Sequence, residues 1–233
     1  MATPDQPPTL PPDLDWRDEV IPVSRKFDDP YFSLAGGLDE TRHVFLAGNR
    51  LPERFRDGFH IAELGFGTGL NLLATVQAHR GPGHLRFTSF EAYPMPAPDM
   101  RRALQAFPEL AEIAGVLLDQ WASGATVLHF PNLTAQVIIG DARQTLPAWG
   151  QKADAWFLDG FSPAKNPELW TPDLLHHVAR HAAPGGTFAT YTAAGHVRRA
   201  LAEAGFSVTR VPGFGRKRHM TVGELSPSEP QRP

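Results

Sequence analysis

The sequence contains no cysteine among its 233 residues. This absence excludes disulfide bonds, catalysis by a thiolate and metal sites that need cysteine ligands. The sequence also has no apolar run approaching the roughly 20 residues that span a membrane. Its first residues, Met1–Pro8, lack the basic and apolar regions of a secretory signal. We therefore expect a cytoplasmic protein without membrane contact.

The chain also has little net charge, with a formal value of −3 at pH 7. A generic polyanion binder is thereby excluded, and any contact with nucleic acid requires a local basic patch. Hydrophobic residues make up 42% of the chain, which is enough for the core of one large domain. We expect a tail and lid-like extension over residues 1–57, a domain over residues 58–225 and a disordered tail over residues 226–233.

A glycine-rich stretch after Phe59 contains the strongest functional signal. An apolar run predicts a short strand over residues 59–64, glycines follow at positions 65, 67 and 69, and a helical pattern begins at Leu70. This order places free backbone N–H groups at the positive end of a helix, and glycine lets a ligand approach the backbone closely. The stretch is typical of a cofactor cradle, although a purely structural turn has the same pattern.

The acid Glu63 bears on the kind of cofactor. The spacing G-x-G-x-G differs from the dinucleotide pattern G-x-G-x-x-G, and an acid beside the turn would repel a pyrophosphate. S-adenosylmethionine fits better, because its amino group and sulfonium are cationic and its carboxylate can meet the helix end. The predicted cofactor-binding residues of this stretch are Glu63, Gly65, Gly67, Thr68, Gly69 and Asn71.

Strand-like and helical segments alternate after this stretch, which predicts an α/β fold with a mainly parallel sheet and helices on both faces. We expect seven strands in the sheet, and a strand-like run over residues 125–130 that forms a hairpin with residues 133–139. The first four parallel strands end in Glu63, Glu91, Asp141 and Asp159. A single acid at a strand end is usually a turn or cap residue. Four acids along the rim where ligands bind favour a cofactor site.

The spacing of these acids suggests individual roles. Glu91 lies where nucleotide folds place the acid that binds the ribose hydroxyls, which disfavours NADP and is compatible with NAD. Asp141 is predicted to accept a hydrogen bond from the adenine amino group. Asp159 is also predicted to line the cofactor site, and it opens the loop 159–167, which combines a carboxylate, an aromatic ring, a lysine, an amide and two prolines. For an amine acceptor, Asp159 is expected to orient the nitrogen and, unless water does so, to take its proton.

With these residues assembled, the sequence resembles the methyltransferase domain of the bifunctional tRNA wobble-uridine enzyme MnmC and its single-domain relatives, the MnmD family. The matching segments are Asp28–Ser33, Thr41–Leu46, Gly48–Arg50, Glu63–Asn71, Ser89–Glu91, Trp156–Pro167, Pro184–Gly186 and Gly213–Arg218. The resemblance implies a class I, Rossmann-like methyltransferase fold. It also implies methyl transfer from S-adenosylmethionine to the exocyclic amine of 5-aminomethyl-(2-thio)uridine at the tRNA wobble position.

The resemblance also implies an enzyme without the FAD-dependent oxidase domain of MnmC, because the chain ends at residue 233. We therefore expect no FAD, and an aminomethyl precursor supplied by another route. No metal site is expected, and no obligate protein partner is inferred. The alternative functions are methylation of a small-molecule or protein amine, an NAD-dependent oxidoreductase, and a non-catalytic RNA-binding module.

Substrate contacts are predicted in two loops. Arg216, Lys217 and Arg218 form a basic run that we interpret as a phosphate-binding patch for tRNA, although such runs are often solvated turns. Phe161 is expected to stack on the uracil base or to pack in the core. Lys165 is expected to meet a phosphate or to cap its own loop.

Overall fold

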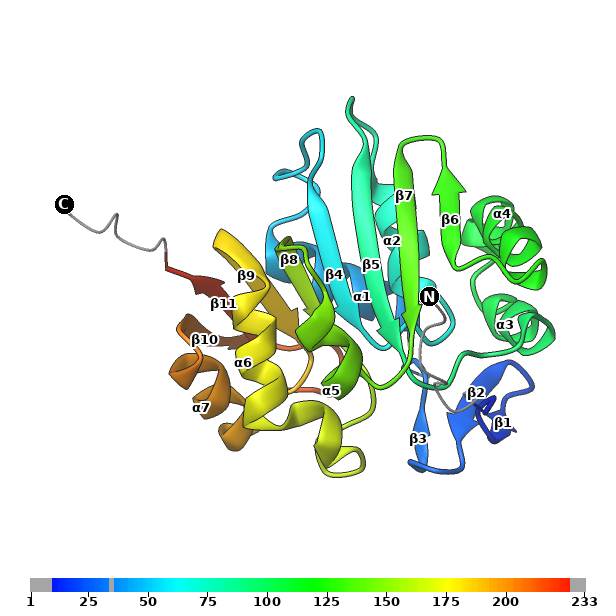
Figure 1. The fold of residues 1–233 in the computed structure, drawn as a ribbon. Helices are drawn as coiled ribbons and strands as arrows, with labels where there is room; N and C mark the ends of the chain where they lie inside the picture. Colours follow the sequence, from blue (N-terminus) through cyan, green and yellow to red (C-terminus); the bar gives the residue numbers. More distant parts are fainter. Residues whose placement is uncertain (1–9, 34–35, 227–233) are drawn as a thin grey trace, which may run out of the picture.

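A single large β-sheet forms the centre of the protein (Figure 1). The structure, a computed structural model, describes residues 10–33 and 36–226 of the chain, so the predicted tail 226–233 lies almost wholly outside the described residues. In the described residues this sheet has eight strands, in the order β10-β11-β9-β8-β4-β5-β7-β6. Their bounds are β4 His60–Leu64, β5 Leu85–Glu91, β6 Val127–Phe130, β7 Leu133–Ile139, β8 Ala153–Leu158, β9 Ala182–Thr190, β10 Phe206–Pro212 and β11 His219–Leu225.

The middle of the sheet is parallel, as the alternation of strands and helices predicts. β4 pairs in parallel with both β5 and β8, and β7 and β9 continue the parallel arrangement on either side. The chain therefore proceeds outward from β4 in both directions, which makes the carboxyl end of β4 a topological switch point. β11 is antiparallel to both of its neighbours, and β6 is antiparallel to β7.

The strand number differs from the predicted seven. The hairpin expected between residues 125–130 and 133–139 is present, but its first arm, β6, pairs along β7 from Val127 to Phe130 and becomes an eighth, edge strand. The alternation of exposed and buried residues along β6 explains its place, because only one of its faces packs on the core.

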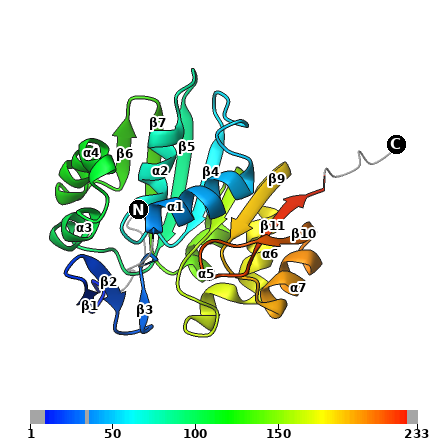
Figure 2. The same ribbon diagram turned by 180° about the vertical axis from the view of Figure 1, so that it is seen from behind.

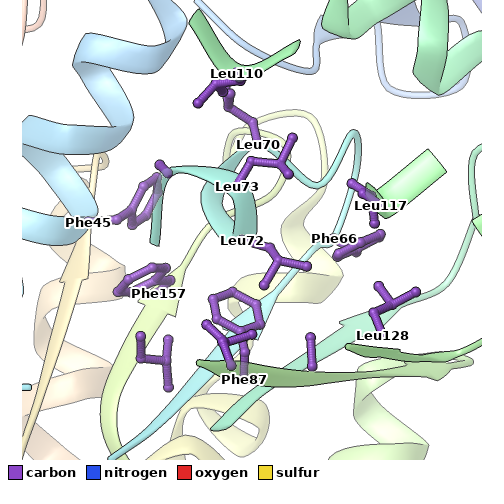
Figure 3. Packing of buried hydrophobic residues seen from close by; sticks show 14 of the residues in the cluster. Phe45, Phe66, Leu70, Leu72, Leu73, Phe87, Leu110, Leu117, Leu128 and Phe157 are labelled. Carbon is purple, nitrogen blue, oxygen red and sulfur yellow. The ribbon is translucent and has the colours of Figure 1, made fainter. Parts of the chain in front are cut away.

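Helices cover both faces of the sheet (Figures 1 and 2). Their bounds are α1 Gly37–Thr41, α2 Leu70–Ala78, α3 Ala97–Leu104, α4 Ala111–Ala122, α5 Ala142–Thr145, α6 Pro172–Arg180 and α7 Gly195–Glu203. The side chains of β8 alternate between two hydrophobic cores: Ala155 and Phe157 join the core beneath α2, and Trp156 and Leu158 join the core beneath α6. Figure 3 shows the first of these cores. Because both faces of β8 are buried, the sheet is held in place between the two cores. The strand-end acids lie at the rim of this sheet.

The N-terminal extension forms a small sheet of its own. β1 (Leu14–Arg17), β2 (Ile21–Ser24) and β3 (Asp29–Pro30) pair in that order. This sheet lies beyond the carboxyl ends of the parallel strands (Figure 1). α1 then continues through a π-helical turn, Arg42–Leu46, and a 3-10 turn, Ala47–Asn49. No helix in the described residues is long and apolar enough to cross a membrane.

Candidate active site

The glycine turn follows β4 and leads into α2. Gly65, Gly67 and Gly69 have φ values of 83°, 54° and 76°, a left-handed region that other residues rarely adopt. A Cβ atom on Gly67 would lie 3.2 Å from the ring of Tyr31, and one on Gly65 would lie 3.3 Å from the Cα of Gly160. The turn therefore needs glycine for its backbone conformation and for the close approach of neighbouring segments.

A cavity of about 820 Å³ opens at this turn, at the carboxyl ends of the parallel strands. Its volume suits a small-molecule ligand. Of the residues predicted from the sequence, the structure places the following along its wall: Gly65, Gly67, Thr68, Asn71, Glu91, Asp141, Asp159, Phe161, Arg216 and Lys217. Glu63 and Gly69 lie behind this wall, and Lys165 and Arg218 lie outside it.

Asn71 connects two of the predicted acids. Its Nδ2 donates hydrogen bonds of 2.8 Å to Oε1 of Glu63 and 2.8 Å to Oδ2 of Asp159. Ser89 donates to the other oxygen of Glu63 at 2.6 Å, so this carboxyl group, only 1% exposed, is fully hydrogen-bonded. Burial raises the pKa of Glu63 well above its usual value, while the hydrogen bonds from Ser89 and Asn71 oppose this effect. Glu63 therefore holds the Asn71 side chain in place without lining the cavity itself.

Asp159 presents its carboxyl group to the cavity. Besides the hydrogen bond from Asn71, it accepts one from the N–H of Gly160 at 2.8 Å. Burial raises the pKa of Asp159 from 3.8 to about 6, against the opposing effect of those two hydrogen bonds. At a pH above this pKa, Asp159 is an ionised carboxylate that can accept a hydrogen bond or a proton.

Glu91 and Asp141 are bound to backbone groups beside the cavity. Glu91 accepts hydrogen bonds from the N–H of Gly67 at 2.8 Å and of Tyr93 at 2.7 Å, so it clamps the glycine turn, and burial raises its pKa. Asp141 caps α5 by accepting from the N–H of Arg143 at 2.9 Å and forms an ion pair with its guanidinium at 2.6 Å. The hydrogen bond from the Arg143 side chain lowers the pKa of Asp141. Both carboxylates thus have structural roles and also face the cavity.

The loop that begins at Asp159 packs against the N-terminal extension. Phe161 stacks on Phe27 with ring centroids 4.8 Å apart and meets Tyr31 edge-on at 5.0 Å. The structure pairs Lys165 with Asp28, with Nζ 2.9 Å from a carboxylate oxygen, so its charge is already compensated. Residues 26–33 thus supply part of the cavity wall, where the aromatic pair Tyr31 and Phe32 beside acidic residues allows from sequence either a cover for the cofactor site or ordinary packing.

The basic run between β10 and β11 is divided. Lys217 points to the cavity, where it forms an ion pair of 2.7 Å with Glu40 and lies 4.1 Å from the ring centroid of Tyr191. Arg216 also lines the cavity, whereas Arg218 is exposed outside it. The three side chains consequently face different surroundings and do not form one uniform patch.

The cavity combines two chemical environments. The glycine turn and the buried acids behind it suit a ligand with positive charge, because carboxylates favour cations at short range. The acceptor end offers the Asp159 carboxylate, the Phe161 ring and the Lys217–Glu40 pair. This arrangement can hold two reactants side by side and align an amine nitrogen with an electrophile.

The chain is similar to a known protein family and to several known proteins. A family model described as S-adenosyl-L-methionine-dependent methyltransferase matches residues 108–226. A curated relative from Chromohalobacter salexigens, named tRNA 5-methylaminomethyl-2-thiouridine biosynthesis bifunctional protein MnmC, is 46% identical over 93% of this chain and 33% of its own length. A relative of the same name from Pseudomonas paraeruginosa is 49% identical over 90% of this chain and 34% of its own length. The chain thus spans about a third of these relatives.

Solved structures show the same fold. The crystal structure of MNMC2 from Aquifex aeolicus has a TM-score of 0.71 and 28% identity, over 90% of this chain and 69% of that chain. TrmN from Thermus thermophilus has a TM-score of 0.50 and 19% identity, over 85% of this chain and 54% of that chain, which bears on the fold alone.

Proposed function

The chain belongs to the family of S-adenosyl-L-methionine-dependent methyltransferases, and from this membership we propose that it methylates the exocyclic amine of 5-aminomethyl-(2-thio)uridine at the wobble position of tRNA. The product is the 5-methylaminomethyl nucleoside. Family membership also decides the cofactor that Glu91 left open, because it identifies S-adenosylmethionine and not a nicotinamide dinucleotide.

One observation supports the amine acceptor above all others. Asp159 places a carboxylate with a pKa of about 6 at the cavity wall, linked through Asn71 to the glycine turn where the cofactor is expected. A carboxylate in this position can accept an N–H bond from an amine and direct the nitrogen lone pair. The relatives named for biosynthesis of tRNA 5-methylaminomethyl-2-thiouridine support the choice of that amine.

The residues present fit the cofactor. The glycine turn is a cradle that side chains would fill, since a Cβ on Gly67 would meet Tyr31 at 3.2 Å. Gly65, Thr68 and Glu91 face the same cavity and would hold the bound molecule. When bound, S-adenosylmethionine supplies an electrophilic methyl group on a positively charged sulfur.

The remaining roles fall to the chain's own side chains. The amine nitrogen would gain the methyl group as the bond from that group to sulfur breaks and leaves a neutral thioether, and the nitrogen would lose a proton to the Asp159 carboxylate or to water. Phe161 lines the cavity within a group of aromatic rings that includes Phe27 and Tyr31, and this group would contact an unstacked base. Arg216 and the exposed Arg218 would approach the tRNA backbone, while Lys217 stays paired with Glu40.

Transfer of label tests the proposal directly. Incubation with methyl-labelled S-adenosylmethionine and tRNA that carries 5-aminomethyluridine should label that nucleoside, as nucleoside mass spectrometry would show. Asp159→Ala should lower the transfer rate by about a hundredfold or more, while calorimetry should show cofactor binding largely retained. Transfer to free amines or to protein with none to tRNA would refute the proposed acceptor, and retention of full activity by Asp159→Ala would refute the role of this residue.

A further inference from the structure

We propose that Thr41 and Asn71 are positioning residues that together hold the Asp159 carboxylate in the orientation in which it receives the amine. The inference rests on the proposed function, because its first readout is methyl transfer. It also gives Asn71 a role different from the predicted one, since the sequence alone suggests direct cofactor binding.

Asn71 uses every hydrogen-bonding group of its side chain. It lies in the first turn of α2, and the residue is only 5% exposed. One N–H of the amide donates to Glu63 and the other to Asp159, both at 2.8 Å. Its Oδ1 accepts a hydrogen bond of 2.9 Å from the hydroxyl of Thr41. The amide thereby bridges two carboxyl groups that would otherwise face each other without a donor between them.

Thr41 fixes this arrangement from the N-terminal extension. It is the last residue of α1 and is only 4% exposed. The structure gives Oδ1 of Asn71 no other donor in the described part of the chain. Without the Thr41 hydroxyl, a buried carbonyl oxygen would be left unpaired, which is costly. The amide would then turn toward another partner and release Asp159.

Other charged and titratable groups also face Asp159. Lys217, from the loop between β10 and β11, lowers the pKa of Asp159, and Glu40, from α1, raises it. Tyr191, just after β9, has its own pKa raised by burial and by Asp159, and Glu63 lies across the Asn71 amide. Among the hydrogen bonds and charges that favour the ionised form of Asp159, the bond from Asn71 is the largest. Loss of this bond should therefore move the titration of Asp159 to higher pH.

The pH profile of methyl transfer separates a positioning role from a structural one. We would measure kcat and KM for S-adenosylmethionine between pH 5 and 9 in wild type, Thr41→Val, Thr41→Ser and Asn71→Leu. Thr41→Val keeps the shape but removes the hydroxyl, and it should raise the midpoint of the acid limb by about one pH unit. Thr41→Ser restores the hydroxyl and should return the limb toward that of wild type. Asn71→Leu should shift the limb at least as far as Thr41→Val.

Two outcomes would overturn the inference. One is an acid limb that does not move in either Thr41→Val or Asn71→Leu. The other is a higher KM for S-adenosylmethionine with an unchanged profile, which would make Asn71 a cofactor ligand. If wild type transfers no methyl group to tRNA, the proposed function fails, and carboxyl-carbon NMR titration of Asp159 still tests the inference. A pKa of Asp159 that is raised in Thr41→Val and returns to the wild-type value in Thr41→Ser supports the inference. Equal titration of Asp159 in wild type and all variants overturns the inference.

Discussion

The buried environment of Asp159 disfavours the ionised carboxylate that the proposed function requires. Its carboxyl group is held in a site where burial raises its pKa to about 6, so the ionised form required for the proposed role is disfavoured by the fold. The protein tolerates this cost because Asn71 and the N–H of Gly160 donate to the carboxylate. Residues whose environment serves chemistry at the expense of stability are typical of active sites.

Replacement of Asp159 by asparagine should therefore stabilise the fold at alkaline pH. Since the folded pKa lies above the ordinary value of 3.8, the stabilisation by the protonated group is complete below about pH 4 and is lost as the pH rises through 6. Well above pH 6 the neutral variant Asp159→Asn lacks this loss, so its free energy of unfolding should be higher than that of wild type by roughly 3 kcal/mol. Urea unfolding at pH 8 and pH 4.5 measures the difference.

The control is Asp119→Asn, at an exposed position of α4. This variant should show little difference from wild type at either pH. Asp159→Asn that is destabilised equally at pH 8 and pH 4.5 would contradict the expected pH dependence.

At the scale of the element, the turn between β4 and α2 is the part of the site whose shape depends most on its sequence. Each of its three glycines has positive φ, and Glu91 pins the middle one through the N–H of Gly67. The Tyr31 ring from the N-terminal extension covers the same glycine. The turn is thus confined on both sides, and a side chain at Gly67 must displace one of its neighbours.

Gly67→Ala should weaken cofactor binding. The φ of 54° costs alanine about 1 kcal/mol, and its Cβ would meet the Tyr31 ring at 3.2 Å. We expect a loss of about tenfold or more in affinity for S-adenosylmethionine, equal to roughly 1.4 kcal/mol, measured by calorimetry. Gly124→Ala is the matched control, because Gly124 has a φ of 83° but no atom within 4 Å of the added Cβ. The control should lose stability and keep its affinity; equal losses of affinity in both variants would point to general destabilisation.

The sequence predicts local features of the site better than its distant contacts. The glycine turn and the strand-end acids could be recognised because their spacing follows from one strand, one turn and the parallel sheet. The contacts of Thr41 with Asn71 and of Glu40 with Lys217 join residues that are 30 and 177 positions apart. No periodicity encodes such pairs, so only the folded structure reveals them. The hairpin of β6 with β7 could be predicted because its two strands are adjacent in the sequence, whereas the addition of β6 to the sheet as an eighth, edge strand could not.

At the scale of the whole molecule, the low net charge of −3 leaves recognition of a polyanion to local groups. Arg216 lines the cavity and Arg218 is exposed beside it, both on the loop between β10 and β11. This loop lies at the same rim as the proposed acceptor site. Long-range attraction of tRNA by the whole protein is weak, so a few cations near the cavity should dominate the salt dependence.

The double variant Arg216→Ala, Arg218→Ala should raise KM for tRNA and flatten its dependence on salt. Each lost phosphate contact reduces the slope of log affinity against log salt by roughly one. Steady-state transfer assays between low and moderate salt measure this slope. Arg80→Ala, an exposed arginine in the connection between the end of α2 and the start of β5, is the control and should leave the slope unchanged. An unaltered slope in the double variant would exclude the loop as a tRNA contact.

The buried acids around the glycine turn have a further consequence for ligand binding. Glu63 and Glu91, beside the glycine turn, both have raised pKa values, mainly because their carboxyl groups are buried. A positively charged ligand among them favours their ionised forms, so its arrival drives protons from the protein into the solvent. We therefore expect uptake of the cofactor to release protons, and its apparent affinity to increase with pH until these carboxyl groups are already ionised in the free protein.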